Sequence, residues 1–102
     1  MEFEWDPVKA NANYRKHGVL LSDDVSVLED ESALTVRDPH FEEEERWITL
    51  GVDSLGRLLV VIYEWRGASI RLISARSATR HEWHEYYKDG GAKYGPRSKG
   101  KR

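Results

Sequence analysis

The segment Leu58-Leu59-Val60-Val61-Ile62-Tyr63 is apolar at every position, and the rest of the chain can be placed around it. It is too short to cross a membrane, and its β-branched residues indicate a strand that is buried on both faces. Residues 65–68 are then predicted to form a turn, and residues 69–75 a second strand whose one charged residue is Arg71. We expect the other elements to pack around these two strands.

A helix is predicted directly after the second strand. Thr79 and Glu82 have the spacing of a capping box, in which the threonine oxygen and the glutamate carboxylate each accept a hydrogen bond from a free backbone amide. Trp83, Tyr86 and Tyr87 follow at helical spacing and form one apolar stripe. The basic side chains at this strand-to-helix junction are Arg71, Arg76, Arg80, His81 and His84. This basic cluster is the most function-like feature of the sequence.

The start of the chain predicts a strand and a helix. Residues 1–5 alternate between apolar and acidic side chains, which indicates a short strand packed on one face. Asp6-Pro7 supplies an N-cap and a first helical residue, and Gly18 is suited to end the helix after about His17. Asn13 lies on the apolar face of this helix, so the helix either lies at the edge of the core or presents that edge to a ligand.

Between that helix and the central strands, the sequence predicts one more helix and two more strands. The short helix runs from Asp23 to about Glu29 with Ser22 as its N-cap. Strands are predicted at residues 33–37 and 46–52, and the turn at residues 53–56 joins the latter to the central strand as a hairpin. The order β-α-α-β-β-β-β-α indicates an α+β domain, in which N-terminal helices and a C-terminal helix pack against a small antiparallel sheet.

Length and composition favour a soluble globular protein with one domain. The chain has 102 residues, 39% hydrophobic and 33% charged, and no cysteine, which excludes disulfides and thiol chemistry. No apolar run reaches the length of a membrane helix, and the acidic residues after Met1 do not fit a signal peptide, so a cytoplasmic protein is expected. Residues 1–88 are predicted to form the domain, and residues 89–102 a flexible basic tail with too few apolar side chains to fold.

Charge is distributed unevenly along the chain. The segment up to Glu64 has 15 acidic and 6 basic residues, and the segment from Trp65 onward has 3 acidic and 10 basic residues. A basic half suggests a surface that meets a polyanion such as RNA. The alternative is that both halves are ordinary solvated surface and interleave in the fold.

Neither a metal site nor a nucleophilic triad is indicated. The four histidines are His17, His40, His81 and His84, and no His-Glu-x-x-His or EF-hand spacing occurs. His81 and His84 are three apart on the predicted helix and could converge with Glu85, but surface histidines on a basic helix are the simpler interpretation. The run Glu42–Glu45 lacks the alternating spacing of a formed cation site. No serine elbow and no phosphate-binding glycine loop occurs, so no cofactor is expected.

RNA cleavage is compatible with the residues that remain, because RNA carries its own nucleophile in the 2′-hydroxyl. The reaction needs a base, cations that hold the phosphate, and an acid for the leaving oxygen. Arginine matches phosphate oxygens in a bidentate way, and histidine titrates near neutrality. Aromatic side chains can stack on exposed bases. A protein-binding module is the competing interpretation of the same residues.

Several segments match a known family. They are Phe3-Glu4-Trp5-Asp6, Lys9, Asn13 and Lys16-His17-Gly18-Val19 near the start, Glu44-Glu45-Arg46-Trp47-Ile48-Thr49-Leu50-Gly51 and Gly56-Arg57-Leu58-Leu59-Val60-Val61 in the middle, and Ile70-Arg71-Leu72-Ile73-Ser74-Ala75-Arg76, Ala78-Thr79, Glu82 and Tyr86 near the end. On these residues the chain resembles the BrnT toxins of bacterial type II toxin–antitoxin systems, over nearly all of residues 1–88. It departs from the family in a longer tail and in a more acidic loop at residues 42–45.

The resemblance implies a RelE-like α+β fold and a ribonuclease that stops translation. Because the sequence offers no credible ligand set, cleavage without a metal is expected. It also implies a cognate BrnA-type antitoxin with a ribbon-helix-helix DNA-binding portion, through which alone the complex would contact operator DNA. By motif position, the candidate catalytic residues are Lys9, His17, Arg71, Arg76, Arg80 and Tyr86. The alternative is a catalytically weak protein-binding and corepressor module of the same complex.

Overall fold

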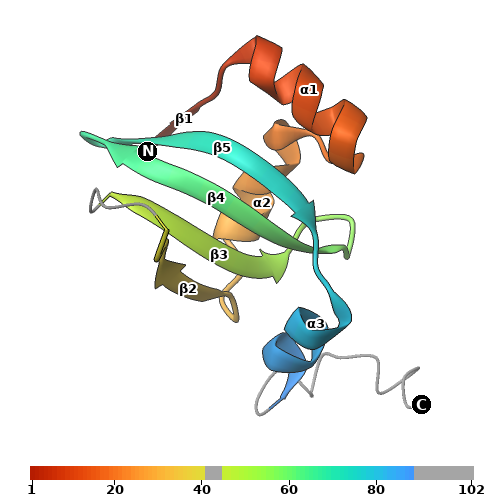
Figure 1. Cartoon of the computed structure of the whole chain (residues 1–102). Coiled ribbons are helices and arrows are strands. Elements are labelled where there is room, and N and C mark those ends of the chain that lie inside the picture. The colour runs from red at the N-terminus through yellow and green to blue at the C-terminus, as the bar shows by residue number, and fades with distance from the viewer. Residues whose placement is uncertain (41–44, 89–102) are drawn as a thin grey trace.

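In the computed structural model, which describes residues 1–40 and 45–88, five strands form one sheet with three α-helices around it (Figure 1). The elements in chain order are β1 (Glu2–Glu4), α1 (Pro7–His17), the 3₁₀ turn η1 (Leu21–Asp23), α2 (Asp24–Leu28), β2 (Leu34–Arg37), β3 (Arg46–Val52), β4 (Leu58–Arg66), β5 (Ser69–Ser77) and α3 (Arg80–Tyr87). This order confirms the α+β class and the predicted β-α-α-β-β-β-β-α succession.

The strands lie in the order β1-β5-β4-β3-β2, and β2 to β5 pair antiparallel as predicted. The expectation of an entirely antiparallel sheet is wrong at one edge, because β1 runs parallel to β5 with Phe3 opposite Ile70. The chain leaves β1 into α1 and returns to β5 only after the other strands. No hairpin turn therefore fixes the relative direction of β1 and β5.

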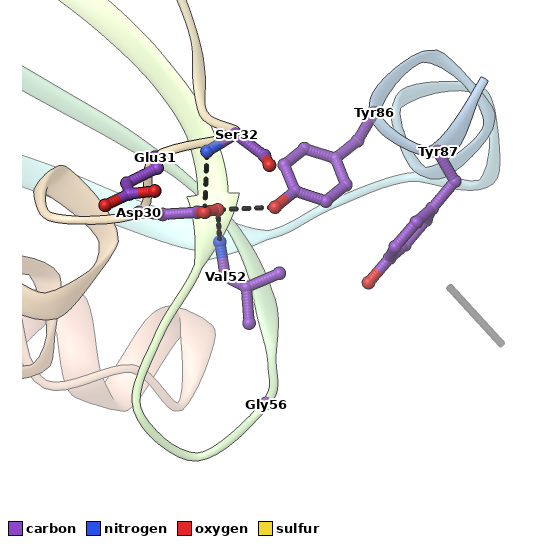
Figure 2. A pocket seen from close by; sticks show the side chains of 7 residues that line it. All are labelled: Asp30, Glu31, Ser32, Val52, Gly56, Tyr86 and Tyr87. Atoms are coloured by element: carbon purple, nitrogen blue, oxygen red, sulfur yellow. Dashed lines mark hydrogen bonds between the residues drawn. The ribbon is translucent and has the colours of Figure 1, made fainter. Parts of the chain in front are cut away.

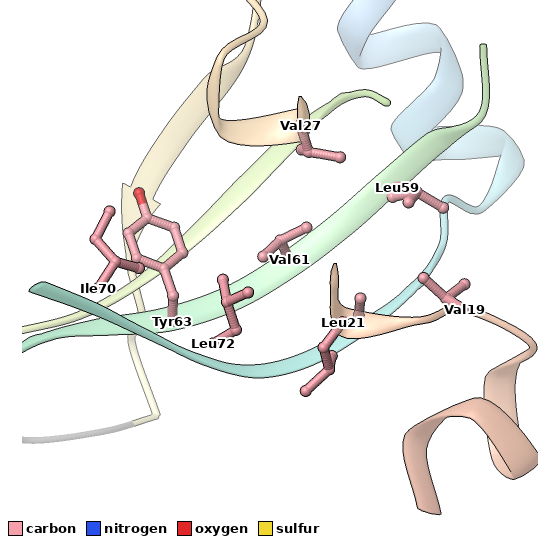
Figure 3. Close-up of a cluster of buried hydrophobic side chains, with 9 residues drawn as sticks. Val19, Leu21, Val27, Leu59, Val61, Tyr63, Ile70 and Leu72 are labelled. Atoms are coloured by element: carbon pink, nitrogen blue, oxygen red, sulfur yellow. The ribbon is translucent and has the colours of Figure 1, made fainter. Parts of the chain in front are cut away.

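Burial of β4 on both faces agrees with its apolar sequence. Leu59, Val61 and Tyr63 point into the larger core, and Val60 joins a smaller core with Tyr86 of α3 on the other face. Figure 3 shows the larger core, whose labelled side chains are Val19, Leu21, Val27, Leu59, Val61, Tyr63, Ile70 and Leu72. Each large apolar side chain buried in this way stabilises the fold by about 1.5–3 kcal/mol.

The predicted boundaries of α1 are confirmed. Asp6 caps the helix, since its Oδ1 accepts a hydrogen bond of 2.9 Å from the amide of Val8, and Pro7 is the first helical residue. Gly18 ends it with a φ of 72°, a conformation that favours glycine, and its amide donates to the carbonyl of Tyr14.

The prediction of Ser22 as the cap of the second helix is wrong. Ser22 lies inside η1, and α2 begins at Asp24 without a side-chain hydrogen bond at its N-terminus. The completely buried side chain of Leu21 explains the difference, because η1 places this residue in the core before the α-helix begins.

Asn13 joins α1 to the sheet. Its side-chain amide donates to the carbonyls of Val19 and Ala75 at 3.0 Å each, and its Oδ1 accepts from the amide of Ala75 at 3.2 Å. β1 pairs with β5 only as far as Arg71. At Ala75, where no strand of the described residues lies along the outer edge of β5, the side chain of Asn13 bonds the backbone amide and carbonyl that a neighbouring strand would otherwise bond. The polar residue on the face of α1 therefore marks the edge of the core.

Two predicted segments lie partly or wholly outside the described residues: the basic tail at 89–102 and most of the acidic run Glu42–Glu45. Within the described part of the chain, no helix is long and apolar enough to cross a membrane.

The side chain of Asp24 is completely buried, and neither of its carboxylate oxygens has a hydrogen-bond partner among the described residues. Burial, with the nearby charges of Asp23 and Asp53, raises the pKa of Asp24 to about 8, although Arg57 acts in the opposite direction. Arg57 itself binds Asp23 and Asp53 at 2.7 Å each, so its charge is already shared by two carboxylates. The folded protein thus holds Asp24 in its neutral form at pH 7.

We predict that Asp24→Asn removes a pH-dependent cost to stability. The pKa of Asp24 is about 8 in the folded state against a reference of 3.8, so between these pH values the folded state binds a proton that the unfolded state has lost. The free energy of unfolding of the wild type is therefore undiminished by Asp24 below about pH 4 and falls as the pH rises to about 8. Asparagine carries no charge, so the variant should gain on wild type over this window. Urea unfolding at pH 4, 6 and 8 measures the difference, with Glu31→Gln as an exposed control. Parallel stability curves for wild type and Asp24→Asn would contradict the prediction.

Candidate functional site

The two faces of the sheet are covered differently. Leu59, Val61 and Tyr63 point toward the helical segments α1, η1 and α2, so the alternate side chains of β4 point to the opposite face. There, α3 packs at only one end (Figure 1). We call the remainder of this side the open face, and strand pairing assigns to it Val36, Ile48, Ile62, Glu64 and Arg71. Val36 is 57% exposed, so the open face is accessible to a partner.

Arg76 lies where β5 ends and α3 begins. Its register partner on β4 is Val60, which places it on the same side of the sheet as the open face. Its two terminal nitrogens donate to the two carboxylate oxygens of Glu82 at 2.9 Å each, and Nη1 also donates to the carbonyl of Ser77 at 3.2 Å. The bidentate bond from Arg76 lowers the pKa of Glu82 to about 2. The pair is therefore ionised at any physiological pH.

Arg80 is the first residue of α3 and is exposed. It makes no salt bridge within the described part of the chain. Because α3 starts four residues after Arg76, the structure brings these two predicted site residues together at one junction. His81 and His84 are also exposed on α3, and the ring centroids of His84 and Trp83 lie 5.2 Å apart in a T-shaped arrangement.

Arg71 lies at the opposite end of β5. Arg76 is five positions further along the strand, which corresponds to roughly 16 Å. It pairs with Glu4 of β1 at 3.8 Å and stands opposite Glu64 of β4, so two acidic residues flank it. The structure thus does not unite Arg71 with the arginines of the β5–α3 junction at a single phosphate.

Lys9 and His17 lie on α1, which runs along the edge of the sheet beside β5. Both are exposed, one helical turn before and after the buried Asn13, whose side chain bonds the backbone of Ala75. No ion pair or hydrogen bond of the described residues joins either of them to Arg76 or Arg80.

Tyr86, the last predicted site residue, is buried with 6% of its surface exposed. Its hydroxyl donates to Oδ2 of Asp30 at 2.5 Å, and Asp30 also accepts from the amides of Ser32 and Val52 at 2.9 Å each (Figure 2). Burial and the Asp30 carboxylate raise the pKa of Tyr86 well above its ordinary value. This contact fastens α3 to the loop between α2 and β2, while the catalytic assignment of Tyr86 stays a prediction.

A groove of about 460 Å³ opens beside this contact (Figure 2). The residues that line it are Asp30, Glu31, Ser32, Val52, Gly56, Tyr86 and Tyr87. Two carboxylates make this groove unsuitable for a polyanion, whereas the β5–α3 junction carries the cations Arg76 and Arg80.

The sequence assigned Glu82 only to the capping box, which the structure confirms. The hydroxyl of Thr79 accepts from the amide of Glu82 at 3.1 Å, and Glu82 accepts from the amide of Thr79 at 2.8 Å. The second role of Glu82, as the partner of Arg76, was not predicted. The sequence feature that could have indicated this pair is the short separation of the two residues. Arg76 lies near the end of the predicted strand, and the capping box places the carboxylate of Glu82 in the first turn of the helix that follows.

No group of three histidine, aspartate or glutamate side chains converges as a metal site within residues 1–40 and 45–88.

Comparison with known proteins points to one family. A family model described as "Ribonuclease toxin, BrnT, of type II toxin-antitoxin system" matches residues 5–82. The crystal structure of the Brucella abortus ribonuclease toxin BrnT is similar with a TM-score of 0.64 and 26% identity, covering 78% of this chain and 99% of that chain. The comparison with curated proteins found no match. The matched range includes all the candidate residues except Tyr86.

We predict that Tyr86→Phe loosens α3. The substitution leaves the ring in its core but removes a donor to a carboxylate, an interaction that typically contributes about 1.5–3 kcal/mol. The free energy of unfolding in urea should fall by this amount, and amide exchange in α3 should become faster. Tyr87→Phe is the matched control, because the Tyr87 hydroxyl makes no hydrogen bond within the described residues. Equal effects of the two substitutions would contradict the prediction.

Proposed function

The chain belongs to the BrnT family of ribonuclease toxins from type II toxin–antitoxin systems, and on that premise we propose that it is an endoribonuclease that cleaves RNA without a metal ion and thereby inhibits translation. The observation that supports this activity most directly is the meeting of Arg76 and Arg80 at the β5–α3 junction, beside the open face. Arg80 is exposed and the side chain of Arg76 is 41% exposed, so both are accessible to an RNA strand.

The proposed reaction uses the nucleophile of the substrate. The 2′-oxygen attacks the adjacent phosphorus, the bond from phosphorus to the 5′-oxygen breaks, and a cyclic phosphate remains on the upstream fragment. A base takes the proton from the 2′-hydroxyl, and an acid gives a proton to the departing 5′-oxygen. Arg76 and Arg80 would stabilise the negative charge that develops on the phosphate oxygens. Arg71 would hold a more distant phosphate of the same strand.

The remaining candidates differ in what their positions allow. Lys9 and His17 are exposed on α1, which lies along the edge of the sheet at β5. RNA would have to extend along this edge to reach both these residues and the arginines of the β5–α3 junction. Tyr86 is engaged with Asp30, so its contribution to the site would be the placement of α3.

The proposed partner is a BrnA-type antitoxin with a ribbon-helix-helix portion, through which alone the complex would contact operator DNA. Leu34 and Val36 support a docking site on the open face, because they are 43% and 57% exposed on an edge strand. An antitoxin segment with apolar and acidic side chains would cover these residues together with Arg76 and Arg80. Apolar side chains beside arginine are typical of surfaces that contribute strongly to binding.

We predict that Arg76→Ala and Arg80→Ala each lower the rate of RNA cleavage by roughly a hundred- to a thousandfold, the usual cost of one lost transition-state contact. Both side chains lie at the surface, so the fold should persist. Cleavage of RNA by the purified variants and growth after expression without antitoxin measure the effect. Arg37→Ala is the control. Arg37 is an exposed arginine of β2, and its register partner Trp47 packs against the larger core, so Arg37 points to the side of the sheet opposite the open face.

Two outcomes would contradict this assignment. Folded Arg76→Ala and Arg80→Ala proteins that still arrest growth would remove the β5–α3 junction from the active site. A wild-type protein that binds its antitoxin but neither cleaves RNA nor arrests growth would identify the weakly catalytic corepressor instead.

We predict that cleavage by the wild-type protein survives excess EDTA. The described residues offer no convergent ligand set, and the arginines can supply the positive charge that a metal would provide. The rate of RNA cleavage should be equal with and without the chelator. Activity that disappears with EDTA and returns with magnesium would contradict metal independence and direct attention to Glu42–Glu45.

A further inference from the structure

Arg76 has five N–H donors, of which three are already engaged. Nη1 donates to Glu82 Oε1 at 2.9 Å and to the carbonyl of Ser77 at 3.2 Å, and Nη2 donates to Glu82 Oε2 at 2.9 Å. No hydrogen bond of the described residues uses the Nε–H or the second N–H of Nη2.

The two remaining donors lie on the same edge of the guanidinium plane. Glu82 occupies the end formed by Nη1 and Nη2, and the edge formed by Nε and Nη2 presents two parallel N–H groups. This spacing matches two oxygens of a phosphate. The side chain of Arg76 is 41% exposed, which allows a ligand of that size to approach it.

Glu82 is itself held in place. Its Oε1 accepts from the backbone amide of Thr79 at 2.8 Å, and its own amide donates to the Thr79 hydroxyl at 3.1 Å. The pKa of Glu82 is about 2, so its charge is present throughout the physiological range. The capping box thus fixes the carboxylate, and the carboxylate fixes the guanidinium.

We infer that Glu82 is a positioning residue that holds Arg76 with its Nε–Nη2 edge ready to bind one phosphate of RNA. This inference rests on the proposed ribonuclease function and adds to it a residue that acts through Arg76. An arginine that is fixed before the substrate arrives loses less side-chain freedom on binding, which favours both affinity and rate.

The alternative interpretation is that the carboxylate of Glu82 competes with phosphate for Arg76 and must leave before phosphate binds. The two interactions use different edges of the guanidinium, so phosphate does not require Glu82 to leave. The two interpretations predict opposite effects of removing the charge of Glu82. Loss of a competitor would raise RNA affinity, whereas loss of a positioning residue lowers it.

The decisive substitution is Glu82→Gln in the full-length protein. Glutamine keeps the length of the side chain and the capping box, but it replaces one of the two oxygens that clamp Arg76. We expect a loss of roughly 10- to 100-fold in the rate of RNA cleavage, comparable to a small misplacement of a catalytic group. Arg76→Lys keeps the charge without the fork. Glu82→Gln should therefore cost little further in the Arg76→Lys background.

A matched control separates positioning from charge. Glu85→Gln removes the same charge from the same helix at a residue that pairs with Lys88 at 3.1 Å, and it should cleave RNA at close to the wild-type rate. Equal losses in Glu85→Gln and Glu82→Gln, or additive losses in the double variant with Arg76→Lys, would overturn the inference.

A binding measurement keeps this inference distinct from the proposed activity. A 2′-O-methyl RNA oligonucleotide of mixed sequence cannot be cleaved, and the nitrogen-15 NMR signal of the Arg76 Nε–H reports whether phosphate binds that edge. We expect the signal to shift on titration of the wild type, with roughly tenfold weaker binding in Glu82→Gln. An unshifted signal, or tighter binding by Glu82→Gln, would overturn the positioning role even if the wild type cleaves RNA. A shifted signal in a protein that cleaves no RNA would refute the activity and support the binding role.

Discussion

The burial of β4 on both faces is the constraint on which the rest of the structure depends. Its odd-numbered side chains Leu59 and Val61 require a cover, which α1, η1 and α2 provide, and Val60 requires a second cover on the other side. A short helix after β5 supplies it through Tyr86. The sheet therefore has helices on both sides, but the second cover is too small to close the whole face. The uncovered remainder is the surface on which RNA and an antitoxin are proposed to bind.

Two polar contacts determine where this short helix lies. The hydroxyl of Tyr86 binds Asp30 near the end of α3, and the carboxylate of Glu82 binds Arg76 near its start. Asp30 also accepts from the amide of Val52, so α3 is tied to the end of β3 as well as to β5. Because Arg80 begins this helix, any motion of α3 would move it relative to Arg76. Placement of the candidate site is thus a property of the contacts at both ends of α3.

The charge asymmetry of the sequence is partly neutralised in the fold. Arg71 from the basic half pairs with Glu4 from the acidic half, so the two halves do interleave at that point. Arg76 is paired within its own half, with Glu82, in a geometry that leaves one edge of the guanidinium available. Arg80 is the exposed cation beside it. The local arrangement of donors is therefore more informative about a phosphate site than the net charge of either segment.

The sequence by itself determined the elements whose signals are local. The cap at Asp6, the left-handed Gly18 and the capping box of Thr79 and Glu82 each involve groups within a few residues, and all three are present. The strand at Arg46–Val52 also begins and ends where its pattern predicts.

Only the tertiary structure decided how these elements meet. The parallel pairing of β1 with β5, the bond of Asn13 to Ala75 and that of Tyr86 to Asp30 join residues more than fifty positions apart. No local pattern encodes such contacts, because they depend on which faces remain to be covered once β4 is buried. For the same reason, a motif could name Lys9, His17 and Arg76 together, although only the packing of α1 along the edge of β5 decides how these residues lie relative to one another.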